Sequence, residues 1–122
     1  MLLVCFFDLQ QRPSRFCVTE LAKRAGELKG KGVLVLAVQG SKVDRQELGT
    51  FVATNSLPFP VGMIAAEEEQ AKFNWGVKSE PWLILTDKDH IVRAEGFALA
   101  ELNERVSLCL QRANRSERKG PD

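Results

Sequence analysis

Residues 29–38 read KGKGVLVLAV, which is a glycine-containing turn followed by six apolar residues. An uninterrupted, valine-rich apolar run of this length is typical of a strand that is covered on both faces. Gly30 and Gly32 are the residues that commonly end a preceding helix. We therefore expect a buried strand at 33–38 that follows directly on a helix.

The residues before this run predict that helix and, before it, a second buried strand. Ser14 is expected to act as the helix N-cap. The apolar positions that follow recur at helical spacing and are Val18, Leu21, Ala22, Ala25 and Leu28. Leu2 to Asp8 form another short apolar run, which predicts a central strand. Strand, helix and strand with short connections indicate a right-handed βαβ unit with parallel strands.

The second half of the chain adds a hairpin and further helices. We expect a helix at 44–55, an extended segment at 57–61, a short helix at 67–74, strands at 82–86 and 91–95, and a helix from 98 to about 114. The prediction is one α/β domain at 1–114 with a mixed sheet flanked by helices. The charged tail at 115–122 is expected to be disordered.

Bulk composition narrows the function. The chain has 122 residues, enough for one domain, and 17 basic against 16 acidic residues give a net charge of +1. This balance provides no basis for a nucleic-acid or anionic-membrane partner. The opening apolar run is too short to span a bilayer and lacks the features of a signal peptide, so we predict a soluble domain. A start inside the central strand suggests an excised piece or a shortened variant.

The cysteine and histidine content argues against a metal site. Cys5, Cys17 and Cys109 are the three cysteines, none of them in a Cys-x-x-Cys pair, and His90 is the single histidine. A zinc site needs about four such ligands at close spacing. No metal and no cofactor are predicted, and the odd number of cysteines leaves at least one thiol unpaired within the chain.

Four separated segments together resemble the thioredoxin-like domains of the TlpA and AhpC/TSA (redoxin) type. They are LVCFF at 3–7, KGKGVLVLAV at 29–38, LPFPV at 57–61 and WGVKSEPWLIL at 75–85. The resemblance covers roughly residues 2–108. It implies a thioredoxin-like fold in which the Glu80–Pro81 peptide bond is cis.

The redox motif of that family is absent. Aligned without gaps, its Cys-x-x-Cys falls on Gln11, Arg12, Pro13 and Ser14. Exchange of dithiols and disulfides needs a thiolate and a resolving thiol, so this activity is not expected. In the family, the main chain beside the cis-proline pairs with an extended peptide. The resemblance thus implies a peptide groove between the degenerate loop and residues Ser79, Glu80, Pro81 and Trp82, in a non-catalytic binding or structural module of a larger protein.

Cys17 supplies an alternative function. Ser14, Cys17, Thr19 and Glu20 resemble the peroxiredoxin pattern, although Gln10 replaces its proline. With Ser14 as N-cap, Cys17 would lie in the first helical turn, where the helix dipole and Arg12 or Arg15 would lower its pKa. The catalytic residues would then be Cys17, Ser14 and Arg15.

Purely structural roles for the same residues compete with both the peptide-binding and the thiol-enzyme hypotheses. Free cysteines are among the most buried residues, which favours a core position for Cys17 as well as for Cys5 and Cys109. A Cys5–Cys17 disulfide is conceivable but is not predicted. Trp82 is either an anchor for a partner or a filler of the space left by the missing motif. A purely structural domain without a ligand is the third hypothesis.

Overall fold

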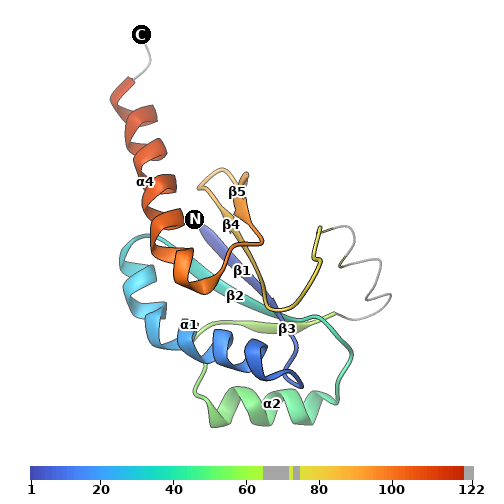
Figure 1. Cartoon of the computed structure of the whole chain (residues 1–122). Helices are drawn as coiled ribbons and strands as arrows, with labels where there is room; N and C mark the ends of the chain where they lie inside the picture. The colour runs from blue at the N-terminus through green and yellow to red at the C-terminus, as the bar shows by residue number, and fades with distance from the viewer. Residues whose placement is uncertain (65–71, 73–74, 120–122) are drawn as a thin grey trace.

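The computed structural model describes residues 1–64, 72 and 75–119 (Figure 1). One five-stranded sheet has the order β3-β2-β1-β4-β5. Its strands are β1 (Leu2–Phe7), β2 (Leu34–Gln39), β3 (Val61–Met63), β4 (Trp82–Thr86) and β5 (Val92–Glu95). The helices described are α1 (Arg12–Gly30), α2 (Arg45–Thr54) and α4 (Leu102–Lys119), with a 3-10 turn at Leu99–Glu101 before α4.

The sheet joins a parallel half to an antiparallel half at β1. β1 and β2 run parallel, with Leu2 opposite Leu34 and Phe7 opposite Gln39, and α1 connects them. β4 runs antiparallel to β1, so that Trp82 lies opposite Phe6. β5 then pairs with β4 as an antiparallel hairpin. The predicted βαβ unit and the predicted hairpin are both confirmed.

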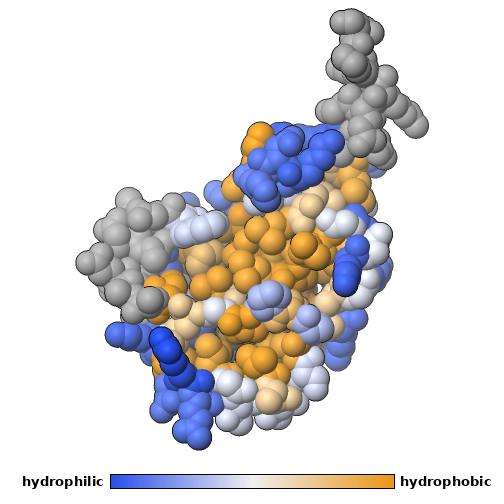
Figure 2. All heavy atoms as spheres, turned by 180° about the vertical axis from the view of Figure 1, so that it is seen from behind, coloured by the Kyte–Doolittle hydropathy of each residue, from blue (hydrophilic) through white to orange (hydrophobic). Residues whose placement is uncertain are grey.

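The main core lies between one face of the sheet and the helices. Side chains of a strand alternate between the two faces. Leu3, Cys5 and Phe7 of β1 therefore point to the same side and pack against α1 and α4. Val4 and Phe6 point to the opposite side, where they form a smaller cluster with Ile84. Viewed from behind, apolar side chains gather in the middle of the molecular surface (Figure 2).

Two features of the elements were not predicted. The extended segment at 57–61 leads into a further strand, β3, which pairs in parallel with Ala37–Gln39 of β2. Three residues that include a glycine carry no strand signal of their own, and the hydrogen bonds of β2 stabilise them. The tail is also partly helical, since α4 continues to Lys119. Residues 115–119 contain good helix formers, and the next glycine is Gly120.

The remaining helices of the first three quarters of the chain were expected at 44–55 and 67–74. The helix predicted at 44–55 is α2, and the side chain of its N-cap, Asp44, accepts a hydrogen bond from the Gln46 main-chain N–H at 2.8 Å. The helix expected at 67–74 lies outside the described residues, apart from residue 72. None of the described helices is long and apolar enough to cross a membrane.

Candidate functional site: the loop between β1 and α1

The degenerate motif lies at the start of α1, but Ser14 does not cap it. The helix begins at Arg12, and its N-cap, Gln11, makes no side-chain capping bond. The fixed backbone angle of Pro13 suits the first helical turn, which explains why the helix begins earlier than expected. Ser14 therefore lies inside the first turn and is completely buried. Its hydroxyl has no hydrogen-bond partner among the described residues.

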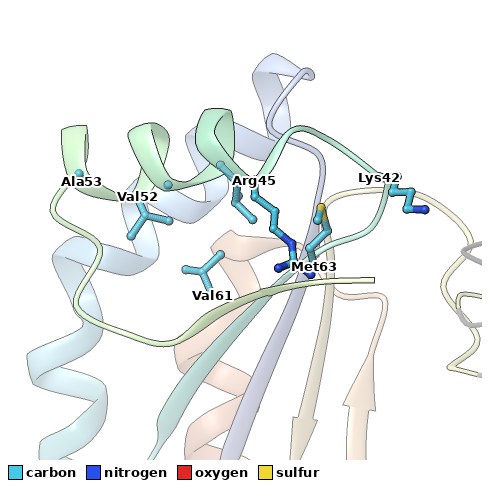
Figure 3. Close-up of a pocket in the computed structure, with 8 residues that line it drawn as sticks. Lys42, Arg45, Val52, Ala53, Val61 and Met63 are labelled. Atoms are coloured by element: carbon cyan, nitrogen blue, oxygen red, sulfur yellow. The ribbon is translucent and has the colours of Figure 1, made fainter. Parts of the chain in front are cut away.

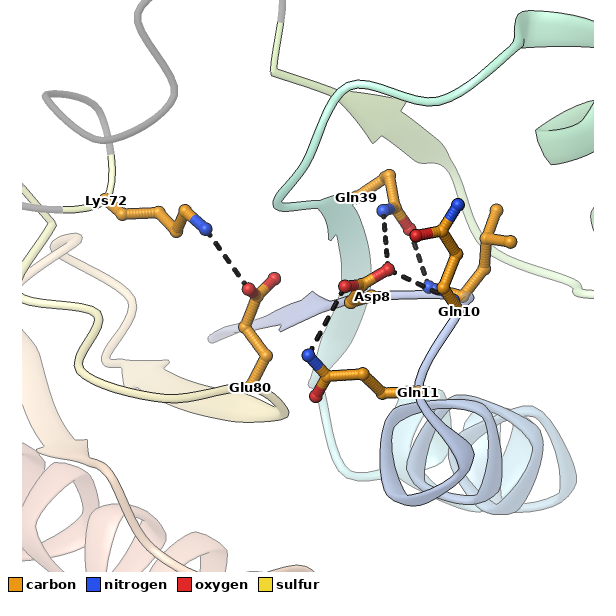
Figure 4. Close-up of polar contacts among 7 residues, drawn as sticks. Asp8, Gln10, Gln11, Gln39, Lys72 and Glu80 are labelled. Atoms are coloured by element: carbon orange, nitrogen blue, oxygen red, sulfur yellow. Dashed lines mark hydrogen bonds and ion pairs between the residues drawn. The ribbon is translucent and has the colours of Figure 1, made fainter.

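A buried polar network holds the loop in place (Figure 4). The Asp8 carboxylate, only 8% exposed, accepts bonds from the Gln10 main-chain N–H at 3.0 Å and from the side-chain amides of Gln39 at 3.2 Å and Gln11 at 3.4 Å. The carbonyl oxygen of the fully buried Gln39 side chain accepts the Leu9 main-chain N–H at 2.9 Å. The ends of two adjacent parallel strands thus fix both the loop backbone and the Gln11 side chain.

The segment around Pro81 faces this loop from β4. The Glu80–Pro81 peptide bond is cis, as the family resemblance implies. The side chain of Glu80 is 9% exposed and forms an ion pair with Lys72 at 3.2 Å (Figure 4). Its carboxylate lies directly against Gly40, where a β-carbon would overlap with it. The absence of a side chain at Gly40 therefore lets Glu80 reach the end of β2.

Three of these positions were missed by the sequence analysis. Asp8 ends the apolar run at 2–8, and Gln39 directly follows the apolar run at 33–38. Lys72 lies in a segment that was expected to be a helix. A polar residue at the carboxyl end of each of two neighbouring parallel strands is a signal for a site, because these ends meet at one edge of the sheet. This signal could have identified Asp8 and Gln39.

Neither family models nor curated proteins match the sequence. Solved structures do match. A thioredoxin-like protein from Porphyromonas gingivalis has a TM-score of 0.76 at 15% identity, over 90% of this chain and 75% of that one. A thiol-disulfide oxidoreductase from Bacteroides fragilis has a TM-score of 0.71 at 18% identity, over 87% and 78%. The chain has the thioredoxin-like fold. A thiol:disulfide interchange protein from Chlorobium tepidum, with a TM-score of 0.69 at 18% identity over 89% and 79%, shares it.

Of the two tryptophans of this thioredoxin-like domain, Trp82 directly follows the cis-proline, and Trp75 contacts Phe6, which lies opposite Trp82 in the sheet. Trp82 is half-buried, and its ring lies over Gly96, where an added β-carbon would come within 2.6 Å of it. Its indole N–H is buried and finds no partner among the described residues. The packing of the ring over Gly96 favours the interpretation that Trp82 fills space left by the missing motif over the interpretation that it anchors a partner. Trp75 is 52% exposed, with its ring tilted against Phe6 at 5.7 Å between centroids.

The three cysteines are buried free thiols. Cys17 is 3% exposed and lies in the second turn of α1, not in the first as expected. A hydrogen bond from the Cys5 thiol lowers the pKa of Cys17 against the opposing effect of burial, with a smaller contribution from the charge of Arg24. The same hydrogen bond, together with burial, raises the pKa of Cys5 well above its usual value.

The structure gives different surroundings to the three residues that were expected to stabilise a Cys17 thiolate. The Arg15 guanidinium donates a hydrogen bond to the Leu9 carbonyl oxygen at 2.8 Å, so it stabilises the loop and not a thiolate. Arg12 is exposed, and the hydroxyl of Ser14 has no described partner. In the described ranges, no group of three His, Cys, Asp or Glu side chains is arranged to hold a metal ion.

Proposed function

We propose that this thioredoxin-like domain is a non-catalytic binding module of a larger protein. It holds an extended peptide segment of a partner between the Gln11–Ser14 loop and the Ser79–Trp82 segment. The observation that carries the proposal is the anchored loop. The Asp8–Gln39 network keeps the loop beside the cis-proline segment, although both cysteine positions of the motif are occupied by other residues.

The chemistry of the loop supports binding without catalysis. Gln11 has no nucleophilic atom, and the amide of its side chain bonds to Asp8. The only hydroxyl of the motif belongs to Ser14, which is fully buried and out of reach of a substrate. Attack on a disulfide needs an accessible thiolate. The loop can therefore shape a groove but cannot exchange disulfides.

The main chain beside Pro81 supports recognition of an extended peptide. Ser79 is exposed, and its main chain makes no hydrogen bond to the described residues. Free main-chain N–H and C=O groups next to a sheet can add an extended segment as a further strand. This pairing uses no side chain, so the loss of both cysteines leaves it intact.

Tryptophan fluorescence tests the groove, because Trp82 directly follows Pro81 and the other tryptophan, Trp75, packs against Phe6, which lies opposite Trp82 in the sheet. We expect saturable changes on titration with a capped, proline-free twelve-residue peptide, with dissociation constants below about 1 mM. Neutral, acidic and basic versions define the preferred partner. A version with alternate N-methylated amides is the control, because it cannot pair through its main chain. It should bind at least about tenfold more weakly. No fluorescence change with any version, or equal affinity of the methylated peptide, would contradict the proposal.

Thiol chemistry at Cys17 is the second candidate, and the hydrogen bond from Cys5, which lowers the pKa of Cys17, favours it. Its burial opposes this candidate, because a nucleophile must meet its substrate. We expect alkylation of all three thiols in the native protein to be about 10³-fold slower than in the unfolded chain, since labelling requires opening of the fold.

The alkylation rate is measured between pH 6 and 10, with Cys17→Ser as the control variant. Equal slow rates in both proteins support the binding module. Fast labelling that disappears in Cys17→Ser, with an apparent pKa clearly below the usual value of about 8.5, would favour a one-cysteine thiol oxidoreductase or peroxidase. Peroxide consumption would then be measured next.

A further inference from the structure

A pocket of about 610 Å³ lies between α2 and β3, outside the loop site (Figure 3). We infer that it binds an amphipathic anion, namely a medium-chain aliphatic carboxylate, whose chain lies along α2 and whose carboxylate meets Arg45. This inference concerns different residues from the peptide groove and does not depend on it. The volume of the pocket between α2 and β3 lies within the range of about 300–1,000 Å³ that is typical of small-molecule sites.

The walls of the pocket are aliphatic. Leu48, Val52 and Ala53 contribute from α2, and Val61 and Met63 contribute from β3 on the other side. The described part of the wall holds neither aromatic rings to stack a planar ligand nor neutral hydrogen-bonding side chains. Burial of apolar surface is therefore the main gain available to a ligand here, and a flexible alkyl chain is suited to it.

Two features keep the pocket open. Gly49 lies in the middle of the α2 wall, and a β-carbon added there would meet nothing within 4 Å. The position of Met63 is held by a hydrogen bond from the Val43 main-chain N–H to its sulfur at 3.4 Å. The β3 side of the pocket is therefore bounded by atoms that are held in place. On the helix side, the missing side chain of Gly49 leaves the space open.

The charge at the pocket selects an anion. Among the described residues that line it, the ionisable ones are Lys42 and Arg45, both cationic. Figure 3 shows Arg45 reaching from the first turn of α2 towards Met63. The nearby carboxylate of Asp44 does not line the pocket and is engaged in capping α2, and Glu47 also lies outside the lining. Arg45 belongs to the positive end of the helix, which adds to the attraction for a carboxylate.

Titration of the full ¹⁵N-labelled chain with sodium octanoate tests the inference by NMR. We expect chemical-shift changes at residues 45–53 and 61–63, with a dissociation constant below about 1 mM. 1-Octanol, which lacks the charge, and butyrate, which lacks the chain, should each bind at least about tenfold more weakly. Arg45→Gln should weaken octanoate by about tenfold while leaving octanol unchanged.

Two variants at one position provide the matched steric control. Gly49→Leu fills the pocket and should abolish octanoate binding, whereas Gly49→Ala adds one methyl group and should retain it. Both substitutions raise helix propensity, so the fold is preserved. The inference is overturned if octanoate causes no shifts at 10 mM, if octanol binds equally well, or if Gly49→Leu binds as tightly as Gly49→Ala.

Discussion

Gln39→Leu is expected to lower the free energy of unfolding by about 2–4 kcal/mol. Gln39 is completely buried, and its amide bonds to both the Leu9 main chain and the Asp8 carboxylate. Leucine fills a similar volume but leaves the buried Leu9 N–H without its acceptor, and it removes one of the two donors to Asp8 Oδ1, which keeps the Gln10 main-chain N–H. The cost of an unpaired buried polar group is larger than the net gain of an ordinary hydrogen bond.

Urea denaturation followed by circular dichroism measures this loss. Gln46→Leu is the control, because Gln46 is an exposed residue of α2 whose side chain makes no hydrogen bond within the described chain. That change should stay within about 0.5 kcal/mol. A loss for Gln39→Leu no larger than that of the control would mean that the network does not hold the loop. Peptide affinity should fall together with stability, since the groove depends on the same loop.

Gly96→Ala is expected to cost about 2–4 kcal/mol, through two separate effects. Gly96 has a backbone φ of +68°, a left-handed conformation in which side chains are strained. A β-carbon there would also approach the Trp82 ring to 2.6 Å, so the ring must move. Because Trp82 follows the cis-proline, its displacement should change the intrinsic fluorescence and weaken the peptide groove.

Gly76→Ala separates these two effects. Gly76 also has a positive φ, +71°, but a β-carbon at that position meets nothing within 4 Å. We expect this control to lose only the backbone contribution of about 1–2 kcal/mol, with less change in the environment of Trp82. Unfolding midpoints and emission maxima of the two variants give the comparison. Equal losses and equal spectra would show that the contact between Gly96 and Trp82 has no structural role.

The structure also changes the interpretation of Cys17. The peroxiredoxin-like pattern placed this residue in a helical first turn beside two arginines. In the structure, the pKa of Cys17 is lowered mainly by its hydrogen bond with Cys5, which lies on β1, twelve positions earlier in the chain. A thiol hydrogen bond inside the core lowers a pKa without making the sulfur accessible. The direction of a pKa shift is therefore weak evidence for catalysis unless the group is also exposed.

Local patterns were sufficient for most elements of the fold. Apolar runs of five or six residues predict β1, β2 and β4, because short, valine- and leucine-rich runs bounded by turn residues are typical of buried strands. Apolar spacing predicts α1 and α2, and the turn at 87–90 predicts the hairpin of β4 and β5. β3 could not be predicted in this way, since its three residues gain their hydrogen bonds from β2.

The sequence by itself determined which chemistry the loop lacks, because no fold can supply a thiol at Gln11 or Ser14. It also indicated, by resemblance, where the cis-proline lies. Only the tertiary structure decided that Asp8 and Gln39, 31 positions apart, share a hydrogen bond, that Cys17 is buried against Cys5, and that Gly40 admits Glu80. These contacts join side chains on different strands and helices, and such pairs leave no periodic trace along the chain. They form only when the sheet brings the ends of its strands together.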